Sequence, residues 1–183
     1  FQPILSLATN EIISFEALAR WRHPEMGVLG PQHFIDTIIH SSLSLPFGRW
    51  LIDQAGQVAS RLRGHGHHAL IGVNLSQDQI ETGAFIEALS ATRHRYDLSA
   101  PFLVAEVLES THFHDLDLAC SLLSEARQLG ALVALDDFGS GISSITYASQ
   151  LPLNTLKVDR SAVMHVDTRQ DQRQFISGII AMG

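Results

Sequence analysis

Short aliphatic runs alternate with longer stretches of helical periodicity along most of the chain, and six of the runs have the length of buried β-strands. The six predicted strands cover residues 3–7, 12–18, 69–75, 102–108, 131–135 and 155–158. A polar turn at residues 8–11 joins the first two, so we expect these two to form a hairpin. The later strands are separated by segments long enough for crossover helices, which is typical of a parallel sheet.

Two of the separating segments place apolar side chains at the spacing of a helix face. The members of the two faces are Leu51, Ala55, Val58 and Leu62, and Leu118, Leu122, Ala126 and Leu129. Gly130 follows the second face at a position that favours a left-handed residue after a helix end. Further helices are expected at residues 32–41, 78–93 and 168–182. Strands that alternate with helices predict an α/β fold.

Composition excludes several classes of protein for this chain. The chain has 183 residues and a formal net charge of −7, so a DNA-binding surface is not expected. The single cysteine, Cys120, excludes an intrachain disulfide. No apolar run approaches the ~20 residues that span a bilayer, so we expect no membrane insertion of this segment. The sequence starts in a strand-like stretch and stops in a helix-like one, so we expect residues 1–183 to be one domain, truncated at both ends, of a longer cytoplasmic protein.

Polar side chains stand at the ends of five predicted strands. They are Glu16 and Arg20, Asn74 and Ser76, Glu106 and Glu109, Asp136 and Asp137, and Lys157 and Asp159. The carboxyl ends of parallel strands gather on one face of a barrel or open sheet, and that face carries the active site. Any one of these residues could instead be an ordinary helix cap or turn residue. That alternative is weaker for Glu106 and Lys157, because each interrupts an apolar run.

The chemistry of this set favours a divalent metal ion. An unpaired buried carboxylate is strongly unfavourable, so the adjacent Asp136 and Asp137 need compensating charge. Together with Glu16, Asn74 and Glu106 they form a set of hard oxygen ligands that suits Mg²⁺ or Mn²⁺ better than zinc. Four carboxylates exceed what one ion needs, and the pattern is compatible with a two-metal phosphoester hydrolase.

Other residues that could bind a metal or a base have more ordinary interpretations. The histidines at residues 65–68 lie between a predicted helix and the next strand, so we expect them in a surface loop on the opposite face. His112 and His114 follow a strand end and are interpreted as solvated loop residues. Trp21 and Trp50 are expected to be packing residues.

Six motifs resemble the EAL-domain family, the bacterial phosphodiesterases that open cyclic di-GMP to linear pGpG. In the order of the family they are FQPI at 1–4, EALARWRHP at 16–24, VNLS at 73–76, EVLES at 106–110, DDFGSG at 136–141 and LPLNTLKVDRS at 151–161. The motifs cover the whole chain. The resemblance implies an α/β fold that is a modified TIM-type (β/α)8 barrel with a reversed first strand. About six of its eight strands are expected in this chain.

The resemblance also implies roles for individual residues. It assigns Glu16, Asn74, Glu106 and Asp136 to one metal, and Asp136 with Asp137 to a second, the metals being Mg²⁺ or Mn²⁺. Lys157 and Asp159 would position or activate the attacking water, and Gln2 and Arg20 would contact cyclic di-GMP. Glu109 would anchor the loop at residues 138–144. A homodimer, and sensory or GGDEF domains that could tether the parent protein to a membrane, are further expectations.

The sequence departs from the family pattern at three positions. Leu108 stands where threonine is usual, Ile142 where tyrosine is common, and Ala162 where phenylalanine is usual. The family also continues beyond residue 183 with a further glutamate motif. These departures leave open a degenerate domain that binds cyclic di-GMP or a protein partner without catalysis. An unrelated metal-dependent barrel enzyme is supported only by the strand-end carboxylates.

Overall fold

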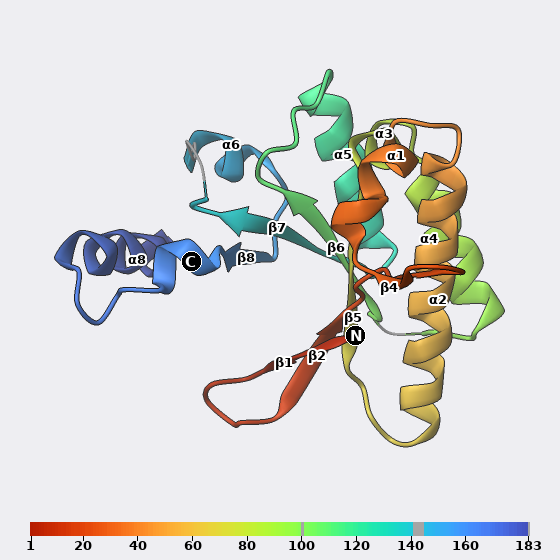
Figure 1. Ribbon diagram of the computed structural model, residues 1–183, viewed down its shortest axis with the longest axis horizontal. Helices are drawn as coiled ribbons and strands as arrows, with labels where there is room; N and C mark the ends of the chain where they lie inside the picture. Colours follow the sequence, from red (N-terminus) through yellow and green to blue (C-terminus); the bar gives the residue numbers. More distant parts are fainter. Residues whose placement is uncertain (100, 141–144, 183) are drawn as a thin grey trace.

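The computed structural model describes residues 1–99, 101–140 and 145–182, and its central element is a curled sheet of six strands (Figure 1). In chain order these strands are β1 (Gln2–Leu5), β2 (Ile12–Glu16), β5 (Leu70–Asn74), β6 (Leu103–Leu108), β7 (Leu132–Phe138) and β8 (Thr155–Val158). They lie side by side in that same order. β1 is antiparallel to β2, and all later neighbours are parallel. The predicted hairpin, reversed first strand and α/β class are confirmed.

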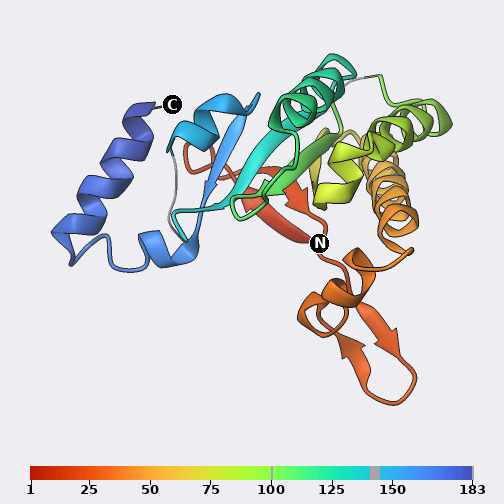
Figure 2. The same cartoon turned by 90° about the horizontal axis from the view of Figure 1, so that it is seen from above.

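Three helices cover the outer face of this sheet: α2 (Ser44–Gly64), α4 (Ala84–Arg95) and α5 (Leu116–Gln128) (Figure 2). The core lies between them and the strands, and side chains such as Ile52, Leu89 and Leu123 are fully buried there. The buried face of α2 is rotated slightly from the predicted one. Ile52 and several small residues are buried against the core, whereas Leu51 and Val58 are only partly buried and pack around them. Small residues allow close packing of this long helix on the sheet.

The remaining helices are short or peripheral. They are η1 (Pro31–His33), α1 (Ile35–Ile39), α3 (Gln77–Glu81), α6 (Ile145–Gln150), α7 (Arg160–Val163) and α8 (Gln170–Met182). α8 lies at the far end of the molecule from α2 and α4, in both views (Figures 1 and 2). Among the described residues, no helix combines the length and the apolar character needed to cross a bilayer.

Two segments differ from the sequence prediction. The predicted helix at residues 78–93 is two helices, because Gly83 adopts a left-handed φ of 70° between α3 and α4. A hairpin of β3 (Trp21–His23) and β4 (Gly27–Leu29) forms a separate small sheet that was not predicted. Its strands have three residues each, too few for a recognisable alternation.

Candidate active site

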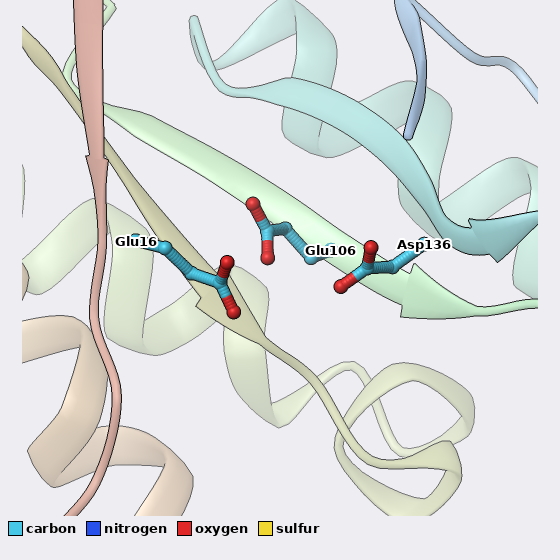
Figure 3. Close-up of side chains that lie close together, drawn as sticks. All are labelled: Glu16, Glu106 and Asp136. Atoms are coloured by element: carbon cyan, nitrogen blue, oxygen red, sulfur yellow. The ribbon is translucent and has the colours of Figure 1, made fainter. Parts of the chain in front are cut away.

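Three carboxylates from three different strands converge at the carboxyl edge of the sheet. Glu16 ends β2, Glu106 lies in β6, and Asp136 lies near the end of β7. One oxygen of each lies within 4.8 Å of the others, and the side chains point toward one another (Figure 3). The convergence follows from the parallel register, which brings the ends of β2, β6 and β7 to one side.

Lys157 of β8 inserts its ammonium among the three carboxylates. Its Nζ donates to Glu106 at 2.8 Å, to Asp136 at 2.9 Å and to Glu16 at 3.3 Å. One cation therefore faces three acidic groups, and the cluster keeps an excess of acidic oxygens. The protein supplies less positive charge than these carboxylates carry, and a divalent cation, which prefers oxygen ligands, would balance the rest.

Burial makes Glu106 a weaker acid than an ordinary glutamate. Its side chain is 2% exposed, and burial raises the pKa of Glu106 to about 7 although the hydrogen bond and charge of Lys157 oppose this. Burial by itself lowers the pKa of Lys157, but its hydrogen bonds to Glu106 and Asp136 outweigh that effect and raise it. Lys157 is therefore a cation at neutral pH.

This pKa predicts how the stability of the metal-free protein depends on pH. The folded-state pKa of Glu106 lies above its ordinary value of 4.5, so its contribution is full below about pH 4.5 and is lost as pH rises through 7. Urea unfolding in EDTA should show a loss that Glu106→Gln reduces. Because ligation needs the carboxylate, Mn²⁺ affinity should rise over the same interval. Identical pH slopes in both proteins would contradict the assignment.

Gly72 of β5 makes room for the Glu106 side chain. A Cβ added at Gly72 would lie 2.3 Å from Oε1 of Glu106, closer than real contacts allow. Gly72→Ala should therefore displace the carboxylate, cost ~1–3 kcal/mol of stability by overpacking and weaken Mn²⁺ binding. Gly64→Ala is the matched control, because nothing lies within 4 Å of a Cβ at Gly64. Calorimetric Mn²⁺ titration of both variants checks this, and equal affinities would contradict it.

Two other predicted ligands adjoin the cluster without joining it. Asn74 donates from Nδ2 to Oε1 of Glu16 at 3.3 Å. Asp137 is exposed and adopts a left-handed φ of 57°, where the pairing of β7 with β8 is irregular. Partial desolvation of its carboxylate, together with the charge of Asp136, raises the pKa of Asp137. The irregular backbone thus gives the adjacent aspartates different environments, which sequence periodicity could not predict.

Glu109 and Asp159 lie in the connections that follow β6 and β8. Glu109 Oε2 accepts from the backbone N–H of Gly139 at 3.1 Å, while its buried Oε1 has no hydrogen-bond partner among the described residues. Asp159 caps α7, because its Oδ1 accepts from the backbone N–H and the hydroxyl of Ser161. These bonds lower the pKa of Asp159. Each carboxylate is therefore held in one orientation by a neighbouring segment.

Gln2 and Arg20, the predicted substrate contacts, are both exposed near Glu16. Gln2 lies opposite Glu16 in the β1–β2 pair. Arg20 donates from Nη1 to the carbonyl oxygen of Ala19 at 2.8 Å. Arg20 thus has a guanidinium that faces solvent beyond the end of β2, outside the carboxylate cluster.

A cavity of about 410 Å³ borders the cluster. Its walls include Glu16, Asn74, Asp136 and Asp137 on the polar side, and Ile35 of α1 on the apolar side. Sequence reasoning missed the contribution of α1, because Ile35 and Ile39 carry no chemical signal and Asp36 follows none of the predicted strands. Leu108, one of the departures from the family pattern, also lines this cavity. Ile142 lies outside the described residues, and Ala162 is buried.

A second cavity of about 520 Å³ adjoins the first, since both are lined by Ala19 and Phe47. Arg20, Trp21 and Trp50 line it. Trp21 contacts neighbouring aromatic rings edge-on and Trp50 stacks on Phe47, as expected of packing residues. Both tryptophans nevertheless remain about half exposed, so their rings also form a wall of the cavity.

The histidines do not join the carboxylate cluster. The segment at residues 65–68 follows α2 and precedes β5, which confirms its place at the opposite end of the strands. His112 is exposed. His114 is also exposed, and its Nδ1 hydrogen-bonds to Glu81 at 2.9 Å.

Comparison with known proteins agrees with this architecture. The family model for the EAL domain matches residues 1–183. The cyclic di-GMP phosphodiesterase NbdA of Pseudomonas aeruginosa is 36% identical over 183 residues, which are 100% of this chain and 23% of NbdA. The cyclic di-GMP phosphodiesterase PA2567 of the same organism is 32% identical over 88% of this chain and 27% of its own length. The chain thus spans about a quarter of these relatives.

Solved structures give the same result. The PaMucR phosphodiesterase in complex with c-di-GMP superposes with a TM-score of 0.88 at 31% identity, covering 100% of this chain and 74% of that one. The EAL enzyme Bd1971 in its cAMP- and cyclic-di-GMP-bound form gives a TM-score of 0.85 at 32% identity, covering 99% of this chain and 50% of that one. The match over the whole sequence, together with the strand-end carboxylates, shows that the chain belongs to the EAL domain family.

Proposed function

We propose that this domain hydrolyses cyclic di-GMP to linear pGpG with Mg²⁺ or Mn²⁺. The observation that carries the proposal is the convergence of Glu16, Glu106 and Asp136, of which Glu16 and Asp136 line a cavity. A bound divalent ion would polarise a phosphoryl oxygen and lower the pKa of a coordinated water. The two named relatives are cyclic di-GMP phosphodiesterases, which supports the same substrate here.

The residues of the chain would share the work as follows. Glu16, Asn74, Glu106 and Asp136 would hold one ion, and Asp136 with Asp137 a second. The protonated Lys157 would orient water and offset negative charge that develops on the phosphate, because its raised pKa makes it a poor base. Asp159 would help to position the water, since its bonds to Ser161 fix its orientation. Glu109 would hold the backbone that follows Asp137 through Gly139.

The second cavity is a suitable place for part of a dinucleotide. Arg20 supplies a donor-rich cation for a phosphate or a guanine edge, and Trp21 and Trp50 supply aromatic surface for a base. Gln2 would contact the substrate from the β1 side of the site. Of the two adjoining cavities, one is bordered by the carboxylates and the other by aromatic rings, which matches a ligand that has both phosphates and bases.

One observation favours a second candidate, a domain that binds cyclic di-GMP without hydrolysis. Leu108 lines the cavity beside Asp136, its partner in the β6–β7 register, and brings an apolar side chain where the family pattern has threonine. Loss of that hydroxyl could weaken the second metal site. The homodimer, the sensory or GGDEF domains and the cytoplasmic location stay predictions.

The test uses the protein in its natural length, with cyclic di-GMP and a chromatographic assay for pGpG. The proposal predicts pGpG formation with Mn²⁺ or Mg²⁺, none in EDTA, and inhibition by Ca²⁺, whose looser geometry suits the reaction poorly. Binding of cyclic di-GMP without pGpG would support the second candidate. Neither binding nor turnover would overturn both.

A further inference from the structure

The segment between β6 and α5, residues 109–115, runs from the carboxylate cluster to the outer helices. At its first residue the backbone N–H of Glu109 donates to the carbonyl oxygen of Asp136 at 2.9 Å. The side chain of Glu109 accepts from the N–H of Gly139. Glu109 therefore braces the chain on both sides of Asp137. Farther along, Tyr147 of α6 donates its hydroxyl to the carbonyl oxygen of Thr111 at 3.0 Å.

The other end of the segment is held by Glu81, the last residue of α3. Oε1 of Glu81 accepts from the backbone N–H of His114, and from that of Asp115 at 3.3 Å. Its Oε2 contacts Nδ1 of His114 at 2.9 Å and accepts from Gln77 at 3.1 Å. The Glu81 carboxylate thus forms four hydrogen bonds, and three of them are to His114 and Asp115, which precede α5.

The environment of Glu81 favours this arrangement. The carboxylate stands at the carboxyl end of α3, where the helix dipole disfavours a negative charge, so the contacts from the segment at residues 109–115 supply the compensation. The Glu81 side chain is 16% exposed, whereas that of His114 is 86% exposed. The bond to His114 is the main cause that lowers the pKa of Glu81 to about 2, so the group is ionised at neutral pH.

We propose that Glu81 is a positioning residue of the active site. By holding His114 and Asp115 it sets the path of residues 109–115, so that Glu109 meets Gly139 and fixes the backbone that follows Asp136 and Asp137. Glu81 belongs to none of the six motifs and touches none of the three clustered carboxylates. As a statement about catalysis, the inference rests on the proposed function, whereas the mechanical link from Glu81 to Gly139 does not.

The test compares Glu81→Ala, Glu81→Gln and a control in the natural-length protein. Glu81→Ala should speed amide hydrogen exchange at residues 109–115 and at Gly139. It should lower kcat for cyclic di-GMP roughly tenfold with little change in KM, and raise the Mn²⁺ concentration needed for half-maximal activity. Glu81→Gln should recover most of this, since its carbonyl oxygen still accepts from the backbone. The control, Glu87→Ala, removes a surface ion pair with Arg49 and should behave as the parent protein.

The outcomes separate the two proposals. A parent protein without turnover would refute the proposed function, while faster exchange at Gly139 in Glu81→Ala would still support the link. Unchanged exchange at Gly139 would overturn the inference. So would a loss of kcat that tracks global stability equally in Glu81→Ala and Glu81→Gln, because that would give Glu81 a merely structural role.

Discussion

Replacement of Glu16 by glutamine is expected to abolish Mn²⁺ binding at the cluster and turnover of cyclic di-GMP together. Glutamine keeps the volume of the side chain and one acceptor oxygen, but it removes one of the three charges that converge at the strand ends. Metal stabilisation of a phosphoryl transition state contributes several kcal/mol, so kcat/KM should fall by ~10³-fold or more. Calorimetric titration with Mn²⁺ and the pGpG assay measure the two effects.

Glu11→Gln is the matched control. Glu11 lies in the same β1–β2 hairpin but is exposed, and its described bond is at its backbone carbonyl, which accepts from the N–H of Ser6. Glu11→Gln should leave the affinity for Mn²⁺ and the turnover of cyclic di-GMP unchanged. If Glu16→Gln lost turnover but kept Mn²⁺ affinity, Glu16 would not be a ligand of the ion.

Replacement of Lys157 by methionine has the second large expected effect. In the metal-free protein this leaves three neighbouring carboxylates without their shared cation, and breaking such a partly buried ion cluster should cost ~3–5 kcal/mol. Mn²⁺ should restore part of that stability, so the rise in Tm on adding Mn²⁺ should exceed that of the parent protein. Thermal unfolding with EDTA and with Mn²⁺ measures the difference.

The same variant tests the catalytic role of the lysine. Turnover should fall by ~10²–10⁴-fold while the affinity for cyclic di-GMP stays near that of the parent, because the proposed role belongs to the transition state. Arg160→Met, at an exposed cation three residues away, is the control. Parallel loss of binding and turnover would instead make Lys157 a substrate anchor.

The position of the carboxylate cluster could be predicted from sequence, and the reason is geometric. Glu106 and Lys157 interrupt apolar runs near the ends of their strands. Because parallel strands bring their carboxyl ends to one edge of the sheet, these side chains were expected to lie near the polar residues that end the neighbouring strands. The structure adds what periodicity does not encode. The ammonium of Lys157 bonds to all three carboxylates, and Gly72 leaves the space for Glu106.

Other parts of the site depend on tertiary contacts and could not be predicted from the sequence. The irregular pairing near Asp137 is a local break in the strand period, and a motif of adjacent aspartates does not reveal it. The part of the wall that α1 forms includes Ile35 and Ile39, which look like core positions in the sequence. Glu81 has no motif, because its role arises only when α3 lies beside the segment that precedes α5.

The most direct test of the central claim is a crystal structure of the natural-length protein grown with Mn²⁺, with anomalous diffraction used to locate the metal. The account predicts a Mn²⁺ ion ligated by Glu16, Glu106 and Asp136, with the hydrogen bonds from Lys157 rearranged around it. A crystal that contains Mn²⁺ elsewhere, or none at the cluster, with Lys157 still bonded to all three carboxylates, would contradict the account.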